Sequence, residues 1–257
     1  MGRLFLSALA LLAAAAVARA EAGGSWFDWW KEDAGAMAAA PSGAAFWLDT
    51  AVVAGSTALV YQFDRDAEKF FNRNKSGFAD GAAKVGEALG NGLYVLPLAA
   101  LGYAAGRLSD DEKVMTSAKL TVEGFAISGI LVNVIKYTAG RKRPASGEGP
   151  GAFHPFDFSP SGDSFPSGHA ATAFAWAGAV AGVYQDRPLV QAGALGLATL
   201  TALSRVYQHK HWASDVVAGS LIGYFTGRGL ASLHGEGAGV TVLPAEGGAT
   251  ALLTVRF

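Results

Sequence analysis

Two histidines stand in sequence contexts that suit nucleophilic or acid–base chemistry. His211 precedes Asp215 by four residues, so the two side chains fall on one face if the segment is helical. A carboxylate at this spacing can hold one ring nitrogen and leave the other free as a nucleophile. An isolated His–Asp pair of this kind could equally be a structural contact.

The second histidine, His169, closes the sequence Phe165-Pro-Ser-Gly-His. Proline and serine favour a helix start, and the N–H groups of a helix N-terminus attract anions. Gly168 lets the backbone approach a ligand closely, and His169 can give or take a proton near neutral pH. Ser167 and Gly168 are therefore candidates for anion binding, although a capping turn beside an incidental histidine is the simpler alternative.

A third group of candidates is basic. Lys136 and Arg143 are seven residues apart, which is two helical turns, and Pro144 would end the helix. Arg205 ends a later helical segment. An Arg guanidinium together with a Lys ammonium is a common phosphate-binding pair in proteins. The alternative is a solvated basic helix end stabilised by the helix dipole, to which we assign the neighbouring Arg141 and Lys142.

Segment length, alanine content and flanking breakers predict the helices that would position these residues. The six predicted helices are Ala44–Phe63, Asn91–Gly106, Ser117–Thr138, Gly168–Tyr184, Pro188–Tyr207 and Trp212–Leu233. A charged helical stretch, Asp64–Glu87, lies between the first two. Ala145–Phe165 is a long Gly/Pro/Ser-rich connection, and loops of that length are often functional. Its Phe153, Phe156 and Phe158 could contact an acyl or prenyl chain or pack against the helices.

An up-and-down arrangement of these helices would bring the candidates together. The end of the third helix, the start of the fourth, the end of the fifth and the start of the sixth then lie at one end of the bundle. Three cations, two histidines, one carboxylate and a helix N-terminus are the parts that phosphoryl transfer requires.

The three groups resemble a known signature. Lys136–Pro144 fits Lys-x6-Arg-Pro, residues 166–169 read Pro-Ser-Gly-His, and Ser204–Asp215 fits Ser-Arg-x5-His-x3-Asp. In these eleven positions the chain resembles the type 2 phosphatidic acid phosphatase family, which shares its fold with vanadium haloperoxidases and bacterial class A acid phosphatases. The likeness extends over roughly residues 44–233.

The resemblance implies a fold and a set of residue roles. The fold would be all-α, an antiparallel bundle of about six core helices, to which the sequence adds a small C-terminal β-hairpin. His211 would form a phosphohistidine and Asp215 would orient it, while His169 would protonate the leaving group and then activate water. The phosphate would be bound by the remaining candidates, which are Lys136, Arg143, Arg205, Ser167 and the Gly168 amide. This mechanism requires no metal and no cofactor.

Composition excludes several other classes of protein. With 20 Lys and Arg against 21 Asp and Glu, the net charge is −1, so the chain has no electrostatic footprint for nucleic acid. The absence of cysteine excludes disulfides, thiolate zinc sites and a cysteine nucleophile. Asp, Glu and His are not otherwise clustered at ligand spacing, which predicts no metal site. The 34 glycines favour close helix–helix packing.

The pattern along the chain predicts four parts. Residues 1–20 read as a secretory signal with a short basic start, an apolar core and an Ala-Arg-Ala cleavage pattern, and an uncleaved anchor is the alternative. Residues 21–43 form an arm containing Trp26, Trp29 and Trp30, which is irregular or a short amphipathic helix. Residues 44–234 form the phosphatase helical domain. Residues 235–257 form the hairpin, with strands at Gly239–Leu243 and Ala249–Phe257.

The charge-free stretches are mostly shorter than the roughly 20 residues that span a bilayer. Asp49 and Glu123 would also lie inside two such spans, where a charge is costly. We therefore expect an exported, periplasmic domain associated with the membrane rather than a protein with six spans.

The expected partner is a phosphorylated substrate, and the apolar frame favours a lipid one. Phosphatidic acid, undecaprenyl diphosphate and lipid A phosphates are the substrates of similar proteins. The alternatives are a non-specific soluble acid phosphatase, a vanadate-dependent haloperoxidase and a non-catalytic envelope protein that binds phosphate. The oligomeric state and the physiological substrate are left open.

Overall fold

A computed structural model describes residues 26–156, 162–234, 237–245 and 248–256. The predicted signal, residues 1–20, and Phe158 of the long connection lie outside these ranges. Residues 21–25 of the predicted arm also lie outside them. The described part of the arm forms a helix, α2 (Trp26–Ala39), followed by a short 3-10 turn at Ala40–Ser42.

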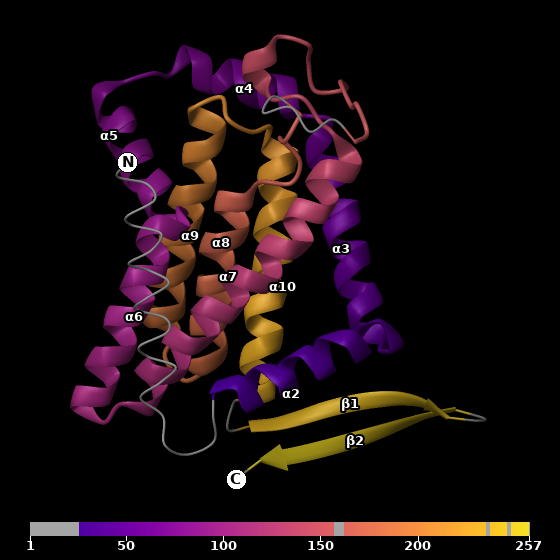
Figure 1. The fold of residues 1–257 in the computed structure, drawn as a ribbon. Helices are drawn as coiled ribbons and strands as arrows, with labels where there is room; N and C mark the ends of the chain where they lie inside the picture. Colours follow the sequence, from indigo (N-terminus) through magenta and orange to yellow (C-terminus); the bar gives the residue numbers. More distant parts are fainter. Residues whose placement is uncertain (1–25, 157–161, 235–236, 246–247, 257) are drawn as a thin grey trace.

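The helices that follow are joined by short turns, apart from the long connection between α7 and α8 (Figure 1). Their bounds are α3 (Ala44–Tyr61), α4 (Asp64–Arg73), α5 (Gly77–Leu89), α6 (Gly92–Ser109), α7 (Glu112–Ala139), α8 (Gly168–Val183), α9 (Pro188–Tyr207) and α10 (Ala213–His234). The predicted helical fold is confirmed, and α9 has the predicted bounds. The charged stretch predicted as one helix is instead two, α4 and α5, because Asn74 and Lys75 interrupt it and Ser76 caps the second.

The centre of the bundle is packed through small residues, as the glycine content predicts. At Gly223 of α10, a Cβ atom would lie 2.1 Å from the Ala171 carbonyl oxygen of α8, and at Gly227 it would lie 2.0 Å from that of Ala175. Only glycine permits these contacts. The α8 and α10 backbones can therefore lie close together, which fixes the ends of both helices relative to each other.

After α10 the chain forms two antiparallel strands, β1 (Gly237–Ala245) and β2 (Gly248–Arg256) (Figure 1). β1 is longer than the segment predicted from the sequence, and β2 has the predicted length but begins and ends one residue earlier. They pair from Gly237 opposite Arg256 to Ala245 opposite Gly248. Residues 246 and 247, between the strands, are outside the described ranges.

Three helices, Ala44–Tyr61, Glu112–Ala139 and Pro188–Tyr207, are long and apolar enough to cross a membrane, and a bent pair, α5 with α6, offers a fourth span. The prediction that the segments are mostly too short is therefore wrong for these helices. The objection that the Glu123 charge would lie in lipid does not apply either, because this side chain is 1% exposed and faces the protein interior. On α3, large apolar side chains such as Trp47 (61% exposed) and Leu48 (66% exposed) face outward. Such a surface indicates membrane association.

Candidate active site

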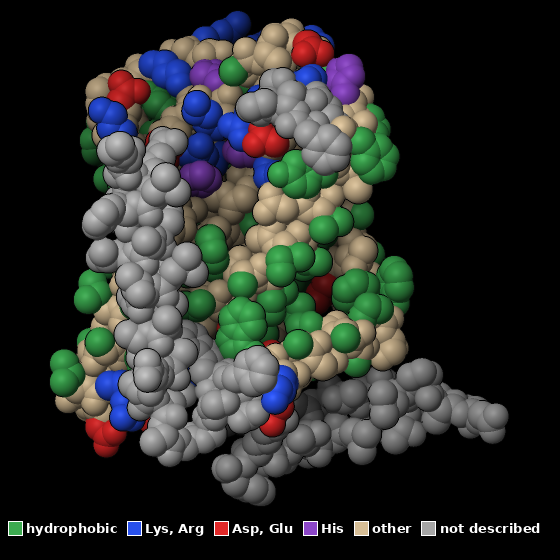
Figure 2. All heavy atoms as spheres, in the orientation of Figure 1, with side chains coloured by type: hydrophobic (Ala, Val, Ile, Leu, Met, Phe, Trp, Pro, Cys, Tyr) green, Lys and Arg blue, Asp and Glu red, His purple; other side chains and the backbone are tan. Residues whose placement is uncertain are grey.

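Charged and histidine side chains gather at the end of the bundle where α4 lies, above a predominantly apolar body (Figure 2). Lys136 near the end of α7 and Arg143 beyond it both contact Asp163. The Lys136 ammonium donates to the Asp163 carbonyl oxygen. The Arg143 guanidinium binds the Asp163 carboxylate through two hydrogen bonds of 2.6 and 2.9 Å. A phosphate that binds the Arg143 fork must share or displace this carboxylate.

The two cations do not share a helical face as predicted. Helix α7 ends at Ala139, and Gly140 adopts a left-handed conformation with φ of 59°. A Cβ atom at Gly140 would lie 1.7 Å from the His154 carbonyl oxygen, so the turn requires glycine. Arg143 follows in extended conformation and precedes a short 3-10 turn at Pro144–Ser146. The cations are brought together by the loop that carries Asp163, and helical periodicity plays no part.

Arg141, assigned above to a solvated helix end, is 1% exposed and lies beneath the site. Its guanidinium donates to Asp215 at 2.5 Å, to Asp64 at 2.7 Å and to the Ser214 hydroxyl at 2.8 Å. Two further hydrogen bonds reach the Pro150 carbonyl oxygen. The assignment was wrong because the glycine turn at residue 140 directs this side chain inward, which the local sequence does not reveal. Arg141 balances two buried carboxylates.

His211 is 3% exposed, and its ring is held through Nδ1, which donates to the Ser164 carbonyl oxygen at 2.7 Å. The nearest Asp215 oxygen lies 3.8 Å from Nδ1, which is longer than a hydrogen bond. That oxygen instead accepts from the Ser164 hydroxyl at 2.5 Å and from the Trp212 N–H at 2.8 Å. Asp215 therefore orients His211 mainly by fixing Ser164 and the backbone beside the ring. Because Nδ1 carries the proton, the lone pair of the ring lies on Nε2.

The second histidine begins α8, where Ser167 is the N-cap and is fully buried. The Ser167 hydroxyl accepts from the Ala170 N–H at 3.4 Å, and its own N–H donates to the Asp215 carbonyl oxygen at 2.9 Å. This backbone bond ties the start of α8 to the start of α10. His169 and Gly168 follow directly in the first turn, so the predicted anion-binding N-terminus lies next to the His211 side of the site.

Arg205, at the end of α9, is 3% exposed. One of its terminal nitrogens, NH1, donates to Gln208 at 2.9 Å and lies 3.3 Å from Glu87 of α5. Its Nε is buried and has no hydrogen-bond partner among the described residues. A buried donor without a partner costs free energy, so this atom is suited to an anion that binds in the site.

Burial and neighbouring positive charge keep both histidines neutral. Burial is the largest cause for His169, and the charges of Arg205, His211 and Arg143 add to it, lowering its pKa to about 3. Burial, opposed by Asp215 and assisted by Lys136 and Arg143, lowers the pKa of His211 to about 4. These mutual effects also show that the two histidines and the cations lie close together.

These pKa values predict how stability depends on pH. Below about pH 6.5, histidines of the unfolded chain take up protons that His169 and His211 in the folded chain do not, so the free energy of unfolding should fall from pH 6.5 toward pH 4. Chemical denaturation at a series of pH values measures this. The His211→Gln variant, which cannot titrate there, should show a shallower decline. An equal decline in both proteins would contradict the lowered pKa of His211.

Several residues of this site escaped the sequence analysis: Asp64, Arg141, Asp163 and Ser164. Asp64 accepts from the Ser214 N–H at 2.8 Å across 150 residues of sequence. Rules based on sequence spacing predict only local contacts, so they could not identify this one. Asp163 and Ser164 stand just before the Pro-Ser-Gly-His motif, and their position in the long connection was the available signal.

Comparisons with known proteins agree with the signature. Residues 119–236 match the PAP2 superfamily. Over 133 residues the chain is 36% identical to a lipid A 1-phosphatase of Porphyromonas gingivalis, which covers 51% of this chain and 26% of that protein. A lipid A 1-phosphatase of Rhizobium etli is 35% identical over 98 residues, or 37% of this chain and 41% of that protein. The chain thus spans well under half the length of these relatives.

Two solved structures have the same fold. A transmembrane PAP2-type phosphatidylglycerolphosphate phosphatase from Bacillus subtilis has a TM-score of 0.57 at 23% identity, covering 74% of this chain and 93% of that one. LpxE from Aquifex aeolicus has a TM-score of 0.52 at 23% identity, covering 66% and 95%. Residues 119–236, the part of the chain that matches the PAP2 superfamily, contain all three parts of the signature.

Proposed function

We propose that the chain is a membrane-associated phosphatase of lipid phosphates that works through a phosphohistidine on His211. The observation that carries this proposal is the buried, neutral His211, held through Nδ1 with Nε2 left to react, among cations that lower its pKa. A purely structural histidine would not need the two cations, Lys136 and Arg143, that act on its charge. The lipid A 1-phosphatases among its relatives support a lipid substrate.

In the proposed reaction, His211 Nε2 attacks phosphorus and the bond from phosphorus to the leaving oxygen breaks. His169 gives its proton to that oxygen. Its pKa is low in the free protein, but a bound phosphate brings negative charge beside it and favours the protonated form. Water then attacks the phosphohistidine, His169 takes a proton from that water, and inorganic phosphate is released while the His211 ring becomes neutral again.

The cations would neutralise the oxygens of the phosphoryl group during both steps. The Arg143 guanidinium and the Lys136 ammonium would bind the phosphoryl oxygens from the α7 side. Arg205 would bind them from α9 through its Nε, which has no hydrogen-bond partner among the described residues. The Gly168 amide at the start of α8 and the Ser167 hydroxyl would complete the set. Asp215 is a positioning residue, because it acts on His211 through Ser164.

A cavity supports a lipid substrate. It has a volume of about 480 Å³ and lies among α6, α7, α8 and α9, with a mostly apolar lining that includes Leu89, Trp176 and Thr201. Its Leu89 end adjoins the site, because a Cβ atom at the next residue, Gly90, would lie 2.8 Å from the His169 carbonyl oxygen. The Leu89 end of the cavity therefore lies near the backbone of the proposed acid, His169, and its apolar lining suits an acyl chain.

Filling the cavity should separate lipid from soluble substrates. Gly102 lines it, and a Cβ atom there would meet only Ala118, at 3.9 Å. We expect Gly102→Phe to lower kcat/KM for a long-chain phosphatidic acid about 10-fold or more, which corresponds to about 1.4 kcal/mol of lost binding. Hydrolysis of para-nitrophenyl phosphate should stay within about twofold. Gly193→Phe on α9, at an open position outside the cavity, is the matched control. Equal losses on both substrates would contradict the assignment.

We further propose that the helical domain, residues 44–234, is exported and acts at the periplasmic face of the membrane. The apolar stretch in residues 1–20 supports export, and the three candidate spans support residence in the membrane. Protease protection in spheroplasts, with the site end tagged in the loop before α8, would test the orientation.

The proposal is tested by phosphate release from phosphatidic acid, undecaprenyl diphosphate, lipid A and para-nitrophenyl phosphate in detergent, with and without EDTA. We expect hydrolysis of at least one lipid that persists in EDTA. Activity on the soluble ester alone would favour a non-specific acid phosphatase. Bromide oxidation that appears only with vanadate and peroxide would favour a haloperoxidase, and phosphate binding without turnover would favour the non-catalytic alternative.

A further inference from the structure

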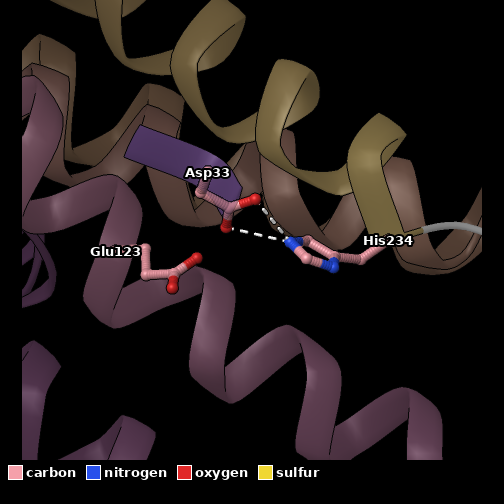
Figure 3. Close-up of side chains that lie close together, drawn as sticks. All are labelled: Asp33, Glu123 and His234. Atoms are coloured by element: carbon pink, nitrogen blue, oxygen red, sulfur yellow. Dashed lines mark hydrogen bonds and ion pairs between the residues drawn. The ribbon is translucent and has the colours of Figure 1, made fainter. Parts of the chain in front are cut away.

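Three metal-ligating side chains gather at the end of the bundle opposite the proposed active site. Asp33 on α2, Glu123 on α7 and His234 at the end of α10 each place a ligand atom within 4.8 Å of the other two (Figure 3). Asp215 and His234 stand in the first and last turns of α10, so about 30 Å of helix separates this cluster from the phosphate site. The sequence predicted no such cluster, because its members lie about 90 and 110 residues apart along the chain.

Glu123 is the member whose environment requires an explanation. It is 1% exposed, and its carboxyl group points toward Asp33 (Figure 3). The Trp29 indole N–H donates to Oε2 at 3.1 Å. The other oxygen, Oε1, is buried with no hydrogen-bond partner in the described part of the chain. A buried carboxylate oxygen without a partner is costly, which indicates a bound cation or proton at this position.

The other two members are already oriented. Asp33 is 3% exposed, and both of its carboxylate oxygens lie within reach of His234 Nε2, at 2.7 and 2.9 Å. The Trp29 ring stacks on the imidazole with 3.7 Å between ring centroids. Trp29 therefore contacts two of the three members, and small side-chain movements would turn Nε2 and the carboxylates toward a common centre.

A divalent ion would balance the charge of this cluster. Two carboxylates and one imidazolium leave a net charge of −1, whereas two carboxylates, a neutral imidazole and a divalent cation sum to zero. Lys119 is the competing cation, since its ammonium lies 4.7 Å from the centre of the Trp29 ring. One nitrogen and two carboxylate ligands suit Zn²⁺, which binds them at about 2.0–2.2 Å and would keep one position for water.

We propose that Asp33, Glu123 and His234 form a structural site for a divalent transition-metal ion, with Zn²⁺ as the probe. On binding, the Nε2 proton of His234 leaves to solvent and its lone pair binds the ion. The bound ion links α2 to α7 and α10, three helices that no short loop joins to one another. The site lies outside the phosphate chemistry and does not depend on the proposed function.

The test uses the full chain, purified in detergent without a histidine tag and stripped with a chelator. We expect about one Zn²⁺ per chain by elemental analysis after desalting. Free Zn²⁺ at about 100 times its Kd should raise the unfolding temperature by about 5–10 °C. Co²⁺, which quenches indole fluorescence, should lower the emission of the wild type more than that of Trp29→Phe.

Variants separate this site from adventitious binding. Glu123→Gln and His234→Gln should each bind Zn²⁺ at least about 10-fold more weakly and lose the thermal shift. Glu32→Gln, the exposed neighbour of Asp33 on α2, and His154→Gln, an exposed histidine, should behave as the wild type does.

Two results would overturn the proposal. The first is a stripped wild-type chain that binds no Zn²⁺ and shows no thermal shift, which would leave a proton and Lys119 as the charge balance. The second is Glu123→Gln binding Zn²⁺ as tightly as the wild type. The first measurement needs no variant, so the proposal stays testable if the substitutions prevent folding.

Discussion

Replacing His211 with alanine should abolish hydrolysis, lowering kcat by about 10⁴-fold or more on every phosphorylated substrate. The reason is that His211 has its Nε2 free to react while Nδ1 is held, beside the cations Lys136 and Arg143. The measurement is single-turnover and steady-state phosphate release in detergent. His154→Ala is the matched control, because that histidine is half-exposed and pairs with Glu148 rather than with a group of the site.

The same residue should carry the phosphoryl group. With para-nitrophenyl phosphate, whose leaving group needs little help from an acid, His169→Ala should still be phosphorylated but should hydrolyse the intermediate slowly. Radiolabel from the substrate should then accumulate on His211, in a form that is stable in alkali and labile in acid. His211→Ala protein that retains turnover, or label on another residue, would exclude His211 as the nucleophile.

The second large effect is on stability and arises from Arg141. Replacing it with methionine leaves Asp64 and Asp215 buried without their shared cation, at 1% and 0% exposure. Removing one partner of a buried ion network costs about 3–5 kcal/mol. For a chain of this size the unfolding temperature should fall on the order of 10 °C. Activity below that temperature should also fall, because Asp215 holds Ser164 and thereby the His211 ring.

Lys142→Met is the control, because the side chain of this neighbouring residue is half-exposed. Its contact with the site is made by the backbone: its carbonyl oxygen accepts from the Trp212 indole N–H at 2.9 Å. We expect its unfolding temperature to stay within about 2 °C of the wild type. Thermal unfolding and residual activity of the two variants check the difference. Similar losses in both would mean that Arg141 does not carry the network.

The helices were predictable because their determinants are local. Ser76, Asn91, Asp111 and Ser167 each cap the helix that follows them, and each caps through its own side chain. Pro188 is the first residue of α9, a position that proline favours. Membrane association was harder to judge, because the sequence shows that Glu123 is charged but not that it faces the interior. The contact that decides this comes from Trp29, 94 residues away.

The sequence by itself determined which chemistry the chain carries: two histidines, three cations and a helix N-terminus, in an order that an up-and-down bundle brings to one end. The tertiary structure alone decided how that chemistry is supported. Gly140 turns Arg141 inward to Asp64 and Asp215. The Ser164 carbonyl oxygen, rather than Asp215, accepts the hydrogen bond from His211 Nδ1. The physical reason is that residue types and local spacing set what a side chain can do, whereas burial and long-range partners depend on the path of the whole chain.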